Sequence, residues 1–163
     1  MNIGGYGVRE HMRLFAPAFG LIAAVWLLRW VMDALGAPHV VVKACSVSGA
    51  TTLAVLISVG LLHFRCVGGY SSVVLGSFLL VLWEQLLIVA AIVFSVASGI
   101  VNVFTAPEYS IKVDDPHHIR HIIGHLTFGV GAGTLLGSAT GCLLLWLLRR
   151  LVPSRTSCEE GSR

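Results

Sequence analysis

The sequence predicts an all-α integral membrane protein, a compact bundle of four transmembrane helices with both termini in the cytoplasm. Three observations lead to this fold class. Of the 163 residues, 56% are hydrophobic and only 12% are charged, whereas soluble domains are about a quarter charged. Four apolar runs are each long enough to cross a bilayer core of about 30 Å as a helix. Arginine and lysine divide unequally between the two ends of these runs.

The first two predicted spans cover residues 14–33 and 43–62, with a turn between them at Gly36 and Pro38. A retained first helix is expected, because its apolar stretch exceeds the length of a signal-peptide core. The glycine pair 68–69 then breaks the chain before the next span. The four spans together predict a single domain over residues 1–152, followed by a polar tail at 153–163 that we expect to be disordered.

The third predicted span covers residues 72–104, which as one helix would be about 50 Å long. That exceeds the bilayer core, so we expect the helix to tilt, protrude or break, with Ser98–Gly99 as the break. The fourth span covers 118–149. Asp115 and Pro116 match the N-cap and first helical position, which would make the histidines that follow them helical.

Orientation follows from the basic residues outside the spans. Seven lie on the side that holds both tails and the loop near residue 65, and three lie on the other side. The seven are Arg9, Arg13, Arg65, Arg149, Arg150, Arg155 and Arg163, and the three are Lys43, Lys112 and Arg120. This asymmetry predicts cytoplasmic termini, and we expect a bacterial inner membrane rather than a eukaryotic one. Cys66 and Cys158 would then be free thiols on the reducing side.

The fourth span carries a glycine at every fourth position, at Gly129, Gly133, Gly137 and Gly141. Residues four apart share one ridge of a helix, and small residues there let another helix approach closely. We therefore expect a glycine zipper, a surface for helix packing within the bundle or between subunits. Chance spacing is the alternative, since glycine is common in membrane helices.

Two charged residues interrupt the spans, Arg29 in the first and Glu84 in the third. A charge at the bilayer centre costs at least about 2.5–3.5 kcal/mol on insertion scales, so it normally faces protein and finds a partner. Depths counted from the start of each apolar run differ by about 6 Å, within reach of an arginine side chain. We predict that the two form a buried pair. Alternatively, Arg29 reaches the outer interface and Glu84 lies at the inner one.

The non-cytoplasmic side collects histidines and acids. His117, His121 and His125 share one helix ridge, with Asp114 beside them and His39 on another segment. Imidazole and carboxylate are common ligands of divalent transition metals, so a metal is the first candidate ligand and haem the second. No zinc-protease signature is present. The alternatives are a proton relay and histidines that simply lie at the membrane interface. The interfacial interpretation is the one that we favour.

These features favour a small multi-pass protein that acts through helix packing as a subunit or assembly partner of a membrane complex. The first alternative is a metal- or haem-binding membrane protein that uses the histidine stripe. The second is a small oligomeric transporter or channel with Glu84 and Arg29 on its pathway. The expected partners are the lipid bilayer and other membrane proteins or further copies of the chain, and not nucleic acid. No catalytic set is visible, and an enzyme is not favoured.

Overall fold

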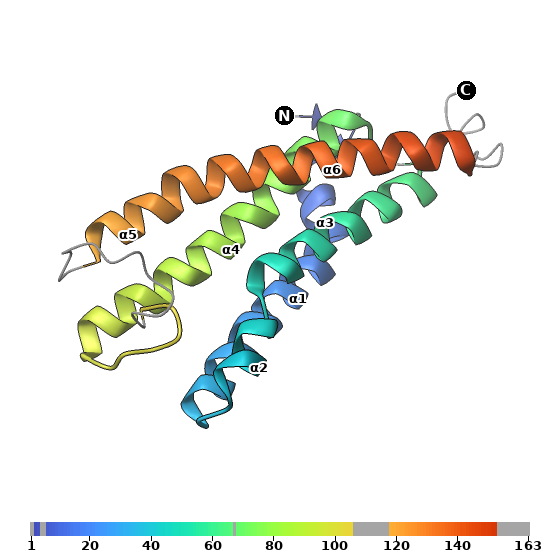
Figure 1. Ribbon diagram of the computed structural model, residues 1–163. Helices are drawn as coiled ribbons and strands as arrows, with labels where there is room; N and C mark the ends of the chain where they lie inside the picture. Colours follow the sequence, from blue (N-terminus) through green and yellow to red (C-terminus); the bar gives the residue numbers. More distant parts are fainter. Residues whose placement is uncertain (1, 4–5, 67, 106–117, 153–163) are drawn as a thin grey trace.

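The computed structural model describes residues 2–3, 6–66, 68–105 and 118–152, in which helices joined by short connections make up the fold apart from one short hairpin (Figure 1). The hairpin pairs β1 (Asn2–Ile3) with β2 (Tyr6–Gly7) in antiparallel register. The helices are α1 (Val8–Ala34), α2 (His39–Ala44), α3 (Val47–Phe64), α4 (Tyr70–Ser98), α5 (Ile119–Gly124) and α6 (Val130–Leu151), with a π-helical turn, η1 (His125–Gly129), between the last two.

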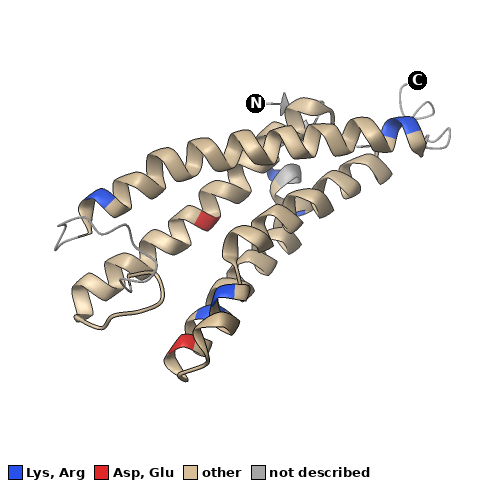
Figure 2. Cartoon of the chain, viewed as in Figure 1, with Lys and Arg blue, Asp and Glu red and all other residues tan. Residues whose placement is uncertain are grey.

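Four helical segments are long and apolar enough to cross a membrane, as the sequence predicts. They are Met12–Ala34, His39–Phe64, Tyr70–Ser98 and Ile119–Leu151. Charged residues lie mainly toward the ends of these segments, and the acidic residue midway along α4, Glu84, is the exception (Figure 2). The helical fold class and its four candidate spans are therefore confirmed.

The end of α4 lies at the break that the sequence predicts. Gly99 has a φ of 71°, the left-handed conformation that closes a helix and that glycine adopts without strain. The chain then folds back on the helix. Asn102 donates to the carbonyl of Ala91 at 2.9 Å, and the hydroxyls of Ser95 and Thr105 lie 2.9 Å apart. Residues 99–104 are thus a hydrogen-bonded loop rather than a continuation of the third span.

The start of α5 differs from the prediction. His118 has a φ of 53° and precedes the helix, which begins at Ile119. A left-handed residue cannot continue a right-handed helix, so the prediction that His118 is helical is wrong. Asp115, Pro116 and His117 lie outside the described residues.

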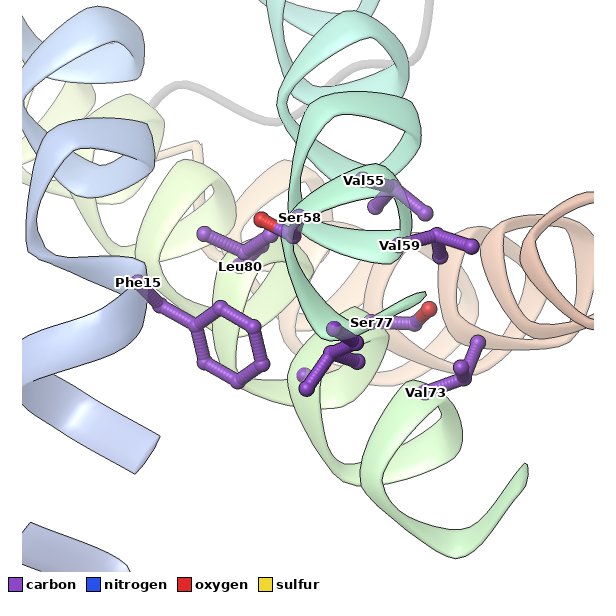
Figure 3. A pocket seen from close by; sticks show the side chains of 9 residues that line it. Phe15, Val55, Ser58, Val59, Val73, Ser77 and Leu80 are labelled. Carbon is purple, nitrogen blue, oxygen red and sulfur yellow. The ribbon is translucent and has the colours of Figure 1, made fainter. Parts of the chain in front are cut away.

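α3 and α4 form the centre of the bundle, because they pack against each other and each also packs against α1 and α6. Where α1, α3 and α4 meet, the ring of Phe15 lies over Gly76 (Figure 3). A Cβ at Gly76 would lie 2.8 Å from the Cζ atom of Phe15, so only glycine admits the ring. Ser58 and Ser77 line a pocket of about 10 Å³ beside it, room for one water molecule at most.

Aromatic contacts fix the register of α1 against α4. The rings of Phe19 and Trp83 lie 6.1 Å apart, and those of Trp30 and Phe94 lie 5.2 Å apart. Both pairs have the same difference in residue number, so the two helices run parallel at one constant offset. Each ring pair is edge-on, the arrangement that aromatic quadrupoles favour.

The cysteines correct one prediction. Cys45 and Cys142 are free thiols, whereas Cys66 is disulfide-bonded. The sequence-based expectation of a free thiol at Cys66 is therefore wrong. The spacing of cysteines in the sequence gave no sign of it, because disulfide partners need only be close in space.

Candidate functional site

Glu84 is the central residue of α4, with 14 residues of the helix on either side. Its side chain is only 3% exposed, so it faces the interior as predicted. The hydroxyl of Ser48, near the start of α3, donates to its Oε1 atom at 2.6 Å. Ser48 is thus a polar partner of this carboxylate, and the hydroxyl of Thr51 on the same helix lies within hydrogen-bonding reach of it as well.

Arg29 lies elsewhere. At the register set by the aromatic pairs, Arg29 is level with Val93, nine residues and about 13 Å beyond Glu84 along α4. Its guanidinium carbon lies 5.3 Å from the centre of the Phe104 ring, a cation–π contact. The predicted pair of Arg29 and Glu84 is not among the contacts of the described residues, because the helices are offset further than the starts of their apolar runs suggest.

A cavity of about 310 Å³ opens beside Glu84, between α3, α4 and α6. Glu84 and Gln85 form its buried floor, and exposed Thr52 and Thr140 lie at its rim. The full lining is Ser48, Thr51, Thr52, Val55, Val81, Glu84, Gln85, Gly129, Gly133, Leu136, Gly137 and Thr140. A buried carboxylate and four hydroxyls therefore share one cavity in the middle of the helical unit.

The glycine stripe of α6 lies along α4. A Cβ at Gly129 would lie 2.6 Å from Gln85 Oε1, and one at Gly133 would lie 2.7 Å from Val81 Cγ1. A Cβ at Gly137 would lie 3.4 Å from the Cβ of Ser77. At Gly141, a Cβ would meet valine methyls of both α4 and α3, at 2.7 and 3.2 Å. Successive glycines thus meet successive turns of an antiparallel α4.

α3 and α6 approach each other closely at one end only. Val55 and Val59 of α3 lie near Gly141, whereas the three atoms nearest to a Cβ at Gly133 all belong to Val81 of α4. The cavity occupies the space where the two helices separate, toward Ser48 on α3 and Gly129 at the end of η1. The close contacts between the glycines and α4 therefore place α6 beside Glu84 and Gln85, at one side of the cavity.

A chain of hydrogen bonds joins α5 to this floor. The Nδ1 atom of His125 lies 2.6 Å from Gln85 Oε1, and its Nε2 atom lies 3.1 Å from Nε2 of His121. An amide oxygen only accepts, so Nδ1 of His125 is the donor. A neutral His125 then accepts at Nε2 from His121. The chain runs from His121 near the start of α5 through His125 to Gln85, the neighbour of Glu84.

The π-helical turn makes this contact possible. In an α-helix a step of four residues overshoots a full turn by about 40°, so a long i+4 series drifts off one face. η1 holds more residues per turn, and the step from His125 to Gly129 does not add to that drift. Consequently His125 and Gly129 both lie against the same side chain, Gln85.

The structure brings together only part of the predicted metal cluster. His121 and His125 are adjacent, whereas His39 begins α2, which lies far from α5 (Figure 1). Asp114 and His117 lie outside the described residues. Within the described residues, no three His, Cys, Asp or Glu side chains are grouped closely enough to hold a metal ion.

Sequence reasoning missed the hydroxyls and Gln85. A signal was available, because Ser48, Thr51 and Thr52 lie within about one turn of a largely apolar run and directly precede five apolar residues. Three hydroxyls this close together in an apolar helix indicate that the helix contacts a buried polar group of another helix. Comparisons of this chain with protein-family models, curated proteins and solved structures find no match.

Proposed function

We propose that this chain is a small multi-pass membrane protein that admits a cation to Glu84 within the bilayer, as a small transporter or a channel subunit. The observation that supports this is the buried carboxylate midway along α4, in a cavity of about 310 Å³. The four apolar helical segments support the location in a membrane. An ionisable group at that depth is expensive to bury and typically marks a pathway or a binding site.

The chain of His121, His125 and Gln85 supports a route to this site from the outer end of α5. Imidazoles that are hydrogen-bonded in series can pass a proton or hold a cation briefly. In this proposal both termini are cytoplasmic, on the seven-to-three distribution of basic residues, and the membrane is a bacterial inner membrane. The disulfide at Cys66 weighs against that orientation, because disulfides are rare in the cytoplasm.

The test is cation flux into liposomes that contain the purified full-length chain. A potassium gradient with valinomycin sets the membrane potential, and a pH-sensitive dye and a sodium-sensitive dye report entry. We expect flux above that of empty liposomes, reduced at least tenfold in a Glu84→Gln variant with the same thermal stability. Flux equal to that of empty liposomes, or unchanged by the substitution, would exclude the proposed pathway.

A second candidate function is that of a subunit or assembly partner in a membrane complex. The glycine zipper of α6 acts inside the bundle in this proposal, against α4. The feature that favours a partner is the opening between α3 and α6, where Leu136 at the rim is 71% exposed. A helix of another copy or another protein would cover this opening better than lipid tails, which cannot hydrogen-bond the hydroxyls.

Cross-linking in native membranes tests this second function. A Leu136→Cys variant without other cysteines should give a disulfide-linked dimer if copies of the chain meet at the opening. A Leu143→Cys variant, which is also exposed on α6 but does not line the cavity, is the control. If neither variant cross-links and the detergent-solubilised chain has the mass of one copy, self-association at this face is excluded.

A further inference from the structure

The charge in the cavity has no basic counterpart among the described residues that line it. Glu84 is the acidic residue there, and the other lining residues carry amide, hydroxyl or apolar side chains. A carboxylate in such surroundings favours a ligand of opposite charge, since the low dielectric strengthens the attraction. A ligand in this cavity is therefore cationic.

The hydroxyl hydrogens of the cavity are already engaged. Ser48 donates to Glu84, Thr51 to the carbonyl of Val47, Thr52 to the carbonyl of Ser48, and Thr140 to the carbonyl of Leu136. Each hydroxyl oxygen keeps a lone pair that can accept. The hydroxyls and the carboxylate thus offer acceptors, while the amide group of Gln85 is the remaining donor in the lining, so a ligand that brings several N–H donors fits this set.

The volume and walls of the cavity indicate an organic cation rather than a bare ion. A volume of about 310 Å³ lies at the lower end of the range of small-molecule sites. Val55, Val81 and Leu136 supply apolar walls for a hydrocarbon body. Calcium would need six to eight oxygen ligands, usually with several carboxylates. A quaternary ammonium is typically held by aromatic rings, and the described lining contains none.

We propose that this cavity binds a small primary ammonium cation with a short hydrocarbon body, its N–H groups donating to Glu84 and the surrounding hydroxyls. The inference rests on the proposed function and names its substrate class. The same ammonium chemistry occurs in free amines and in ethanolamine lipid headgroups. Depth favours a free amine, because Glu84 lies about 21 Å along α4 from either end of the helix, whereas headgroups stay at the interface.

Isothermal titration of the full-length chain in detergent tests the recognition chemistry. The probes are n-butylammonium and tetramethylammonium, which have equal charge and a similar number of carbons but differ in N–H donors. We expect n-butylammonium to bind at least tenfold more tightly. Equal affinities would overturn the proposal, because charge alone would then explain binding.

Two threonine variants, one on α6 and one on η1, give a matched comparison. Thr140 and Thr127 are both exposed and both donate to the carbonyl four residues earlier, but only Thr140 lines the cavity. Thr140→Val should weaken n-butylammonium binding about fivefold to tenfold, since it removes one acceptor for a charged donor. Thr127→Val should leave the affinity unchanged. If the two substitutions change the affinity equally, n-butylammonium does not bind in this cavity and the proposal is overturned.

Glu84→Gln should weaken binding at least about thirtyfold, the usual range for loss of one member of a buried charged pair. Nanodiscs separate the two sources of the ammonium group. If phosphatidylethanolamine lowers the apparent affinity for n-butylammonium relative to phosphatidylcholine, the lipid headgroup competes for the cavity and the free-amine proposal is overturned.

The outcomes for the substrate class and for the proposed function are distinct. Proton or sodium flux that requires Glu84, with no binding of n-butylammonium, would overturn the substrate class and leave the pathway intact. Binding of n-butylammonium that requires Glu84, with no entry of protons, sodium or n-butylammonium itself into liposomes, would overturn the transport function and support the site.

Discussion

Two alanine substitutions on α6 separate helix packing from helix propensity. Gly141 lies in the interior of α6, and Gly131 lies in its first turn, where η1 continues the helical segment on the N-terminal side. No neighbouring atom lies within 4 Å of a Cβ at Gly131, so Gly131→Ala should stabilise the helix by about 0.5–1 kcal/mol. At Gly141 the new Cβ would lie 2.7 Å from a methyl of Val73, 3.2 Å from one of Val59 and 3.4 Å from one of Val55.

The cost at Gly141 follows from these distances. Carbon atoms in optimal contact lie about 3.5–4.0 Å apart, so two of the three methyls must move. Valine has little freedom at χ1, which transfers the displacement to the helix backbones. Overpacking costs about 1–3 kcal/mol, against the gain of up to about 1 kcal/mol from helix propensity. We expect Gly141→Ala to lower the free energy of unfolding by about 1–2 kcal/mol.

Thermal unfolding of the purified protein in detergent, followed by tryptophan fluorescence, measures the difference. For a chain of this length about 1 kcal/mol corresponds to roughly 2–4 °C, so the two variants should differ in Tm by about 5 °C or more. Gly137→Ala should lie between them, because its nearest contact is an ordinary 3.4 Å. A Gly141→Ala protein that gains as much stability as Gly131→Ala would refute close packing of α6 on α4 and α3.

Four further outcomes are expected. A double-mutant cycle of Arg29→Gln and Glu84→Gln should be additive within about 0.5 kcal/mol, as for distant sites; a larger coupling energy would restore the pair that the sequence suggests. Gly99→Ala should lower the free energy of unfolding by about 1–2 kcal/mol, because its φ of 71° disfavours a Cβ; unchanged stability in chemical denaturation would contradict that conformation. In a variant whose only cysteine is Cys66, an impermeant maleimide should react only after cells are opened, and labelling of intact cells would reverse the proposed orientation. Micromolar zinc should raise the Tm of the wild-type chain and not of His121→Ala; equal shifts would leave these histidines without a metal.

The helices were predictable because their determinants are local. Apolar runs of sufficient length predict the four spans, and Ser98–Gly99 predicts the end of α4 because glycine readily adopts the left-handed conformation found there. The inward orientation of Glu84 was also predictable, since a carboxylate in an apolar helix has few stable alternatives. Each of these conclusions depends on residues that are close together in the sequence.

The candidate site was only partly predictable, because it depends on how the helices are offset. Arg29 and Glu84 seemed to match in depth when each was counted from its own apolar run. The offset between α1 and α4 is instead set by ring packing of Phe19 on Trp83, which no local pattern encodes. The same limit applies to Ser48, whose contact with Glu84 depends on where α3 begins relative to the middle of α4.

The π-helical turn between α5 and α6 gives the last span two independently adjustable halves. Deleting one residue within His125–Gly129 would rotate everything on its N-terminal side by about 100° about the helix axis, while the glycine contacts of α6 stayed in place. Sequence change could therefore turn the two histidines toward or away from α4 without loosening the bundle. A chain built in this way can evolve a new entrance to an unchanged interior.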